Sequence, residues 1–205
     1  MQTEEELSRW FSNVTFGFSV QVIGMRNVQI GEGSCIGDSV WLNVCIRDEK
    51  VRMKIGKCVL VGRQSMISTG GYLEIGDHCV LAPRVYVSDA DHVFTDIYQP
   101  ILQQGATLGR SIIVEENCWI GINVVVTGDV PPFTIMAGIP AKIIKMYNPA
   151  TKEWERIKDE THIEQILKIR ESVGMPSREE YKHILATNAR IKHIDPIVAG
   201  KGINI

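Results

Sequence analysis

A six-residue repeat dominates the middle of this chain and restricts the folds that are open to it. The stretch Ile75–His92 divides into three units, IGDHCV, LAPRVY and VSDADH, each opening on an aliphatic residue followed by Gly, Ala or Ser. A period of six fits neither the alternation of an amphipathic strand nor the 3.6-residue period of a helix. It is typical of a chain folded into short flat sides, with one aliphatic side chain per side pointing inward and a small residue at the corner. Three such sides close one coil of a parallel β-helix, and the stacking of coils buries the aliphatic residues.

The same period recurs on both sides of this stretch. Further hexads open at Ile30, Ile36, Leu42, Ile55, Val61, Ile67, Val114, Ile120 and Val126. They complete four clear triplets, preceded by a degenerate first coil that begins near Val14. Two interruptions predict excursions from the coils, a charged surface loop at 48–50 and a projecting loop at 93–111. The chain is therefore predicted to be all-β, a parallel β-helix of hexapeptide repeats with an α-helical extension at its C-terminal end.

The N-terminal residues depart from the repeat. Residues 1–12 predict a short helix that caps an open end of the coils, with Leu7, Trp10 and Phe11 on one side. Together with the hexads they form a predicted β-helical domain over residues 1–147.

The composition changes again after this domain, and we treat residues 148–205 as a hairpin and helical extension. A turn after Asn148 predicts a hairpin between two short strands, and residues 161–173 have helical spacing. Ser177 followed by Glu180 is a capping box that predicts a second helix through about Ile191.

Charge and cysteine content bound the partners and the compartment. The 22 basic and 24 acidic residues leave a net charge of −2, which gives no electrostatic case for binding nucleic acid or an anionic membrane. The sequence shows no secretory signal and no apolar run long enough to span a membrane. The five cysteines contain no CxxC pair, so we interpret them as reduced core thiols of a cytoplasmic protein.

Three segments, taken in this order, make the sequence resemble a known family. They are IGDHCVLAP from Ile75 continuing to Asp91–His92, Trp119–Gly121, and DVPP from Asp129 followed by AGIPAK from Ala137. With the hexads, they resemble the left-handed β-helix acyltransferases of the hexapeptide-repeat family over roughly residues 14–146. The nearest branch is that of the maltose and galactoside acetyltransferases and the polysaccharide O-acetyltransferases. The resemblance implies left-handed coils and a homotrimer whose active sites lie between subunits, with acetyl-CoA as acyl donor and no metal.

The resemblance also implies roles for individual residues. His92 aligns with the catalytic histidine, and a neutral imidazole, which titrates near about pH 6.5, can take the proton of a sugar hydroxyl as it attacks the thioester. The backbone N–H of Ile122 is the implied oxyanion donor. The full set implied to bind the cofactor is Trp119, Gly121, Ile122, Thr127, Lys142 and Lys145. The set implied near the acceptor is Asp89, Asp91 and Gly62, where either aspartate is a candidate to orient His92.

The implied function is therefore acetyl transfer from acetyl-CoA to a sugar hydroxyl of a surface polysaccharide or its precursor. Gly62 stands where the branch places an Asn beside the acceptor, so the acceptor contacts are expected to differ. The family also carries a further coil between the segments that correspond to Trp119–Gly121 and Pro131–Pro132. This chain lacks that coil, so its cofactor groove is expected to be shorter.

Three alternatives remain open from the sequence. One is N-acetylation of an amino sugar on a nucleotide, which would depend less on His92 because an amine is the better nucleophile. Another is a non-catalytic trimeric scaffold, which the shortened groove suggests. The last is a zinc enzyme of the γ-carbonic anhydrase type, which needs three converging histidines. Only His78 and His92 fall within the predicted coils, which argues against it.

Overall fold

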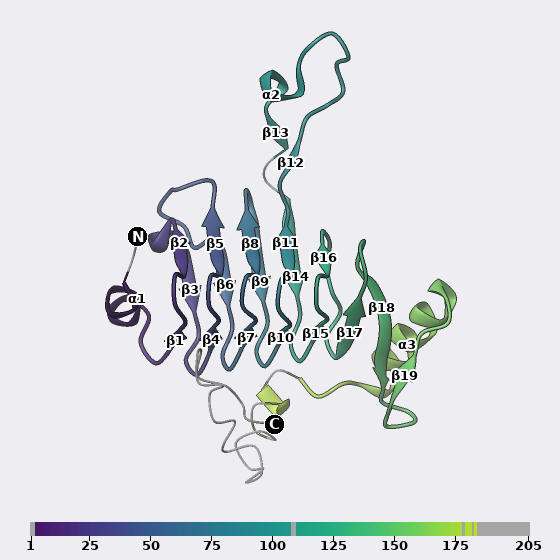
Figure 1. The fold of residues 1–205 in the computed structure, drawn as a ribbon. Coiled ribbons are helices and arrows are strands. Elements are labelled where there is room, and N and C mark those ends of the chain that lie inside the picture. The colour runs from purple at the N-terminus through teal and green to yellow at the C-terminus, as the bar shows by residue number, and fades with distance from the viewer. Residues whose placement is uncertain (1–2, 108–109, 178, 182, 184–205) are drawn as a thin grey trace.

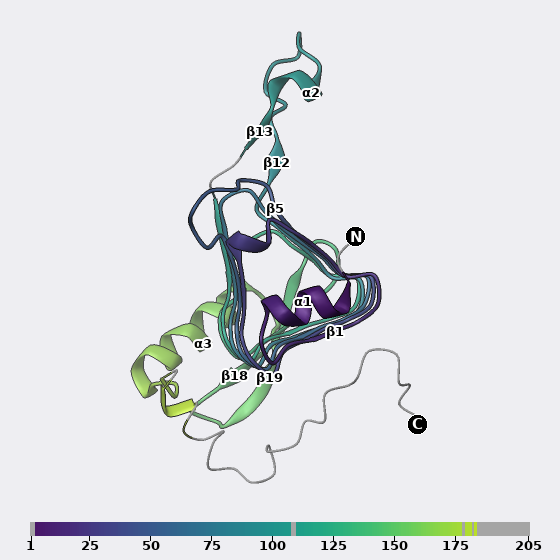
Figure 2. The same ribbon diagram turned by 90° about the vertical axis from the view of Figure 1, so that its left-hand side faces the viewer.

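The computed structural model describes residues 3–107, 110–177, 179–181 and 183. Its centre consists of three sheets of parallel strands, which the chain visits in turn as it winds along the molecule (Figure 1). Seen along the stack of coils, the three sheets form the sides of a triangle (Figure 2). The predicted all-β architecture with few helices is therefore confirmed.

Each sheet collects one strand from successive coils. The eight-stranded sheet contains β1 (Thr15–Phe16), β4 (Cys35–Ile36), β7 (Leu60–Val61), β10 (Val80–Leu81), β15 (Trp119–Ile120), β17 (Thr134–Ala137), β18 (Lys142–Asn148) and β19 (Glu153–Arg156). The five-stranded sheet contains β2 (Gln21–Ile23), β5 (Trp41–Val44), β8 (Met66–Thr69), β11 (Tyr86–Ser88) and β16 (Val125–Val126). The four-stranded sheet contains β3 (Val28–Ile30), β6 (Met53–Ile55), β9 (Tyr72–Ile75) and β14 (Ser111–Val114). Strands pair in parallel within the coils, and among the described strands of these sheets the antiparallel pairs are β17 with β18 and β18 with β19.

Two hexad positions carry the geometry of the coil. First positions stack directly on one another, as Ile36 on Val61 and Val61 on Leu81, and all three side chains are fully buried. Fourth positions bend the chain, since Ser39 and His78 have positive φ angles of 56° and 60°. The period of six thus reflects one inward side chain and one left-handed residue per side.

The second hexad position is set by contact between coils. We call the turn from the eight- to the five-stranded sheet the first corner, the turn from the five- to the four-stranded sheet the second, and the return to the eight-stranded sheet the third. A Cβ on Gly62, at the first corner, would lie 2.5 Å from the backbone of Ala82 in the next coil. A Cβ on Gly76, at the third corner, would lie 2.5 Å from the backbone nitrogen of Glu116. The small residues in the repeat are therefore required where one coil lies against the next.

The second corner holds the insertions. It carries the 3₁₀ turn η1 (Met25–Asn27) in the first coil, residues 45–52 in the second, and a long excursion over residues 89–110 in the fourth. We call this last segment the arm. Its stem is a small antiparallel sheet of β12 (Asp91–His92) and β13 (Ala106–Thr107), and the short helix α2 (Ile101–Gln104) lies near its tip. The arm covers the loop predicted at 93–111 except Ser111, which opens β14, and it projects far from the coils (Figures 1 and 2).

Helix α1 (Glu4–Trp10) lies across the N-terminal end of the coils (Figure 2). A capping box between Thr3 and Glu6 starts the helix, and Leu7 and Phe11 are buried in the core. Trp10, which was predicted to share their face, is instead 52% exposed. Leu7 and Phe11 are four residues apart and share the core-facing stripe, whereas Trp10 lies on its flank.

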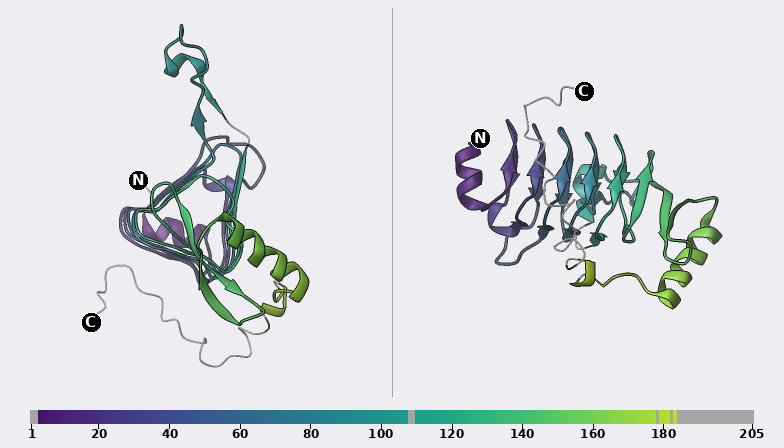
Figure 3. Two further views of the ribbon diagram at one scale, coloured as in Figure 1. Left: turned by 90° about the vertical axis from the view of Figure 1, so that its right-hand side faces the viewer. Right: turned by 90° about the horizontal axis from the view of Figure 1, so that it is seen from below.

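The extension continues from the C-terminal end of the coils, with α3 to one side of the triangle of sheets (Figure 3). Strand β18 turns back antiparallel to β17, and β19 pairs with β18, so the hairpin crosses residue 147, where the sequence suggested a boundary. Helix α3 (Glu160–Val173) packs against β18. Its buried Arg170 donates hydrogen bonds to the carbonyl oxygens of Pro132, Phe133 and Tyr147 at 2.7 to 3.0 Å. Burial lowers the pKa of this guanidinium, and the three carbonyls satisfy its donors.

After α3 the chain returns toward the coils. Ser177 and Glu180 form the predicted capping box, with hydrogen bonds of 2.8 and 3.1 Å, but most of the helix predicted through Ile191 lies outside the described residues. Tyr181 packs edge-on against His78 and Phe133, with ring centroids 5.7 and 5.1 Å apart. This contact half-buries His78.

The cysteines are all free, as expected, but they are not all in the core. Cys79 and Cys118 are buried on neighbouring coils, and Cys35 is buried as well. Cys45 and Cys58 are exposed, which corrects the prediction that all five are core thiols. Cys45 lies in the insertion of the second coil, outside the repeat, and Cys58 occupies a fourth position, which points outward.

Candidate functional site

His92 lies in the stem of the arm. It belongs to β12 and pairs with Ala106 of β13, and its side chain is exposed. Its backbone N–H donates a hydrogen bond to the Asp91 carboxylate at 2.8 Å. The imidazole therefore stands at the second corner, where the five-stranded sheet ends, within reach of a molecule from solvent.

The two aspartates beside His92 have different environments. Asp91 is exposed, and its carboxylate accepts from the amide of His92. Asp89 is 1% exposed, and its carboxylate accepts hydrogen bonds from the Thr69 hydroxyl at 2.9 Å and from the amides of Gly70 and Gly71 at 2.7 and 2.9 Å. The carboxylate of Asp89 is thus hydrogen-bonded to the preceding coil, whereas that of Asp91 is open to solvent.

Three cofactor candidates lie at the first corner, beyond the other ends of the strands of the five-stranded sheet. They are Trp119, Gly121 and Ile122. Trp119 is the first residue of β15, just before the first corner, and is 52% exposed, and Ile122 in the turn is 54% exposed. The amide of Gly121 donates to the carbonyl oxygen of Met136 at 2.9 Å, and a Cβ there would lie 3.0 Å from the same oxygen. Gly121 is therefore required for close packing, and Trp119 and Ile122 present an open apolar surface.

The remaining cofactor candidates fall in two places. Thr127 is exposed and follows β16 at the second corner, on the same side of the sheet as His92. Lys142 and Lys145 are exposed on β18, paired with Ala137 and Ile135 of β17. Both ammonium groups are available to an anionic ligand along the C-terminal end of the eight-stranded sheet.

One chain therefore does not bring all predicted site residues together. His92 and Thr127 lie at the second corner, but Trp119 and Ile122 lie at the first, with the five-stranded sheet between the two groups. Gly62 is also at the first corner, in the third coil, where its backbone packs against Ala82. The arrangement provides two half-sites, one at each end of the strands of a single sheet.

Sequence reasoning missed the residues that hold the arm in place. Thr69, Gly70 and Gly71 form a tight turn in the third coil, and Arg110 at the end of the arm donates to the carbonyl oxygen of Asp89 at 3.2 Å. These residues are 18 or more positions away from Asp89 along the chain. The period itself could have pointed to the turn, because the coil spacing places Thr69 beneath the start of the arm.

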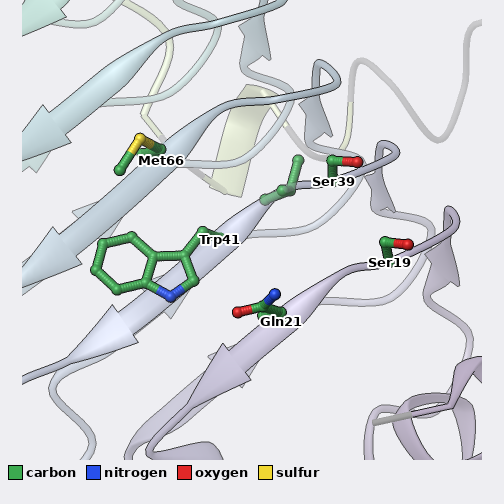
Figure 4. Close-up of a pocket in the computed structure, with 6 residues that line it drawn as sticks. Ser19, Gln21, Ser39, Trp41 and Met66 are labelled. Atoms are coloured by element: carbon green, nitrogen blue, oxygen red, sulfur yellow. The ribbon is translucent and has the colours of Figure 1, made fainter. Parts of the chain in front are cut away.

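A separate hollow of about 300 Å³ lies on the five-stranded sheet near the first corner (Figure 4). It is lined by Ser19, Gln21, Ser39, Val40, Trp41 and Met66. Trp41 and Met66 lie side by side on adjacent strands, and their exposed faces continue toward Tyr86. None of the predicted site residues lines this hollow.

Within the described part of the chain, no three His, Cys, Asp or Glu side chains converge as they would around a metal ion. None of the described helices is both long enough and apolar enough to cross a bilayer.

Solved structures share the fold. AntD, an N-acyltransferase from Bacillus cereus solved with dTDP and 3-hydroxybutyryl-CoA, aligns with a TM-score of 0.55 at 16% identity, over 84% of this chain and 97% of that one. A maltose O-acetyltransferase from Clostridium difficile 630 aligns with a TM-score of 0.51 at 18% identity, over 76% of this chain and 75% of that one. At these identities the likeness concerns the fold alone.

Sequence relatives carry related names, although no family model matches the chain. A protein from Mycobacterium tuberculosis named "Probable acetyltransferase Rv3034c" is 30% identical over 59% of this chain and 45% of its own length. An Escherichia coli protein named "Putative lipopolysaccharide biosynthesis O-acetyl transferase WbbJ" is 30% identical over 40% of this chain and 54% of its own length. The chain thus spans about half the length of these two relatives. Galactoside O-acetyltransferase of Escherichia coli is 24% identical over 58% of this chain and 66% of its length. In its motifs and in the names of its relatives, the chain resembles the hexapeptide-repeat acyltransferases, nearest the maltose and galactoside and polysaccharide O-acetyltransferase branch.

Proposed function

We propose that this protein transfers an acetyl group from acetyl-CoA to a sugar hydroxyl of a surface polysaccharide or its precursor. The observation that carries the proposal is the position of His92, exposed in the stem of the arm at the end of the five-stranded sheet. The names of the relatives, which include lipopolysaccharide and galactoside O-acetyltransferases, support the class of acceptor. The free cysteines fit a reducing compartment, the cytoplasm.

The proposed chemistry is a direct transfer. The neutral imidazole of His92 accepts the proton of the acceptor hydroxyl while the hydroxyl oxygen attacks the thioester carbonyl. The resulting oxyanion accepts a hydrogen bond from the backbone amide of Ile122. Collapse of the tetrahedral intermediate breaks the C–S bond, and the thiolate of CoA leaves with the proton that His92 had taken. No covalent enzyme intermediate is required.

A second copy of the chain would complete this site. His92 and Ile122 lie beyond opposite ends of the strands of the five-stranded sheet. The proton acceptor of one copy must therefore meet the oxyanion donor of another. A closed trimer with left-handed coils, as in the family, satisfies that need in all copies by one symmetry operation. In this arrangement Trp119 and Thr127 flank the pantetheine, and Lys142 and Lys145 meet the phosphates of CoA.

The exposed residues of the chain suit CoA, but its cofactor groove is shorter than that of the family. The exposed Lys142 and Lys145 and the open surface of Trp119 and Ile122 suit a phosphate end and an apolar arm. The five coils end directly in β17, so the groove is short. Calorimetry with CoA tests this fit, and no binding at millimolar CoA would favour the non-catalytic scaffold instead.

Substitution of His92 tests the assignment of the base. His92→Ala is expected to lower turnover by about 100- to 10,000-fold, the range for removal of a general base. The assay is release of the CoA thiol from acetyl-CoA with a panel of mono- and disaccharides, with the oligomeric state checked by sedimentation. His78→Gln is the matched control, because His78 also lies on the coils but at the third corner. Equal turnover in His92→Ala and wild type would overturn the proposal.

N-acetylation of a nucleotide-linked amino sugar is the second candidate. A 36-residue segment is 58% identical to 2,3,4,5-tetrahydropyridine-2,6-dicarboxylate N-acetyltransferase of Thermotoga neapolitana, a match that covers 18% of this chain and 15% of that one. An amine needs less help from a base, so its acetylation should fall much less in His92→Ala. Comparison of hydroxyl and amino forms of the same sugar decides between the two.

A further inference from the structure

A buried carboxylate fastens the start of the arm to the coil beneath it. Asp89 directly follows β11, three residues before His92, and is 1% exposed. One carboxylate oxygen accepts from the amide of Gly70 at 2.7 Å, and the other accepts from the Thr69 hydroxyl and the amide of Gly71, both at 2.9 Å. Three donors thus surround a charge that could not remain buried without them.

The end of the arm is fastened at the same place. Arg110 donates through Nε to the carbonyl oxygen of Asp89 at 3.2 Å, and its own carbonyl oxygen accepts from the amide of Tyr72 at 3.1 Å. Tyr72 directly follows the Thr69–Gly71 turn. Both ends of the arm are therefore tied to each other and to one turn of the third coil.

This arrangement excludes a direct role for Asp89 in chemistry. A side chain with 1% exposure and three donors on its oxygens has no free surface for substrate. Its connection to His92 runs through the backbone of residues 89–92, which leads from the fixed carboxylate into the stem. We propose that Asp89 is a positioning residue that sets the place of His92 in the active site, an inference that rests on the proposed acetyl transfer.

The first test substitutes the carboxylate and keeps its shape. In the full chain, Asp89→Asn puts an amide NH₂ opposite donors, and the stem is expected to shift. A fall in kcat of about 10- to 100-fold follows, since displacement of a reacting group by about 1 Å has an effect of this size. The KM for acetyl-CoA should stay nearly unchanged, because none of the proposed cofactor residues belongs to the arm. Asp77→Asn is the matched control, as Asp77 also accepts from a backbone amide, that of Lys57 at 2.9 Å, but at the third corner.

A double-mutant cycle separates positioning from a general loss of stability. If Asp89 acts through His92, Asp89→Asn should lower the residual turnover of His92→Ala no further. Thr69→Val removes one donor and should lower kcat by a smaller factor, and Thr69→Ser, which keeps the hydroxyl, should restore it. This pair also serves if Asp89→Asn fails to fold. An unchanged kcat in Asp89→Asn and Thr69→Val, or effects that add to that of His92→Ala, would overturn the proposal.

Hydrogen exchange gives a readout that needs no turnover. Amides of the stem, residues 91–92 and 106–107, should exchange at least tenfold faster in Asp89→Asn, while amides of the fifth coil keep their wild-type rates. Wild-type protein without acetyl transfer would count against the proposed function alone. Unchanged exchange in the stem would count against the role of Asp89 alone.

Discussion

The first and third corners of the coils differ from the second in almost every respect. Turns at the first and third corners repeat one conformation, with a left-handed residue such as Ser39 or Asn117 at the fourth hexad position. Turns at the second corner range from the tight Gly70–Gly71 turn to the arm over 89–110. The repeat therefore specifies two corners and leaves the other free to vary.

This difference separates the corners fixed by packing between coils from the corner that carries insertions. The two regular corners need small residues because neighbouring coils touch there, so they cannot accept insertions. The second corner carries the 45–52 insertion, the arm and His92, and side-chain hydrogen bonds rather than the repeat hold its turns. The proposed base, His92, thus lies where the period imposes least on the chain.

The largest expected effect comes from adding one methyl group to a regular corner. Gly62→Ala would place its Cβ 2.5 Å from the backbone of Ala82, so the coils must separate, at a cost of about 2–3 kcal/mol. Gly128→Ala at the second corner is the control, because no atom lies within 4 Å of its Cβ position. Urea denaturation should show a clear loss of stability for the first variant and almost none for the second. Equal stability of the two variants would remove the distinction between the corners.

A smaller effect is expected at the second corner, where one side chain organises an insertion. Asn27 is buried, and its amide donates to the carbonyl oxygens of Asp48 and Lys50 at 2.6 and 2.9 Å. Asn27→Ala should cost about 1–2 kcal/mol, since two carbonyls lose their donor. Gln29→Ala, an exposed neighbour on β3, should change the denaturation midpoint very little. An unchanged free energy of unfolding in Asn27→Ala would mean that the repeat, and not this side chain, shapes the insertion.

The smallest effect concerns pH at the third corner. Burial beneath Tyr181 lowers the pKa of His78 below its ordinary value, and nearby Asp77 opposes this only in part. The folded state thus binds a proton less readily than the unfolded state. Stability from this group is present above about pH 6.5 and is lost as the pH falls through the lowered folded value. Denaturation midpoints of wild type and His78→Gln should therefore diverge on acidification, with wild type losing more. A parallel decline of both would show that His78 carries none of the dependence.

The sequence was sufficient to predict the repeating part of the fold. Buried first positions such as Ile36 and Val61, and small second positions such as Gly62, follow from period and residue size alone. The position of His92 at the end of its run was likewise readable, because the period stops there. The β18–β19 hairpin and α3 followed from turn residues and helical spacing.

The contacts between coils could not be predicted in the same way. Asp89 meets Thr69 because one full coil separates them; the period indicates that the two residues are neighbours but not that their side chains form a hydrogen bond. Arg170 resembles any helix-surface arginine until α3 is placed against the carbonyls of Pro132 and Phe133. Trp10 was expected on the same side of the helix as Leu7 and Phe11, whereas its place at the helix flank leaves it 52% exposed.

The two covered ends of the coils have a consequence for assembly. A stack of parallel coils ends in strands with unpaired N–H and C=O groups, and such an edge can recruit another chain without limit. Here α1 closes one end, and at the other β18 reverses direction while the buried guanidinium of Arg170 locks α3 beside it. Neither end of the coils is therefore left as a bare stack of strand edges. The elements that complete the core at its two ends also act against growth of the stack into filaments.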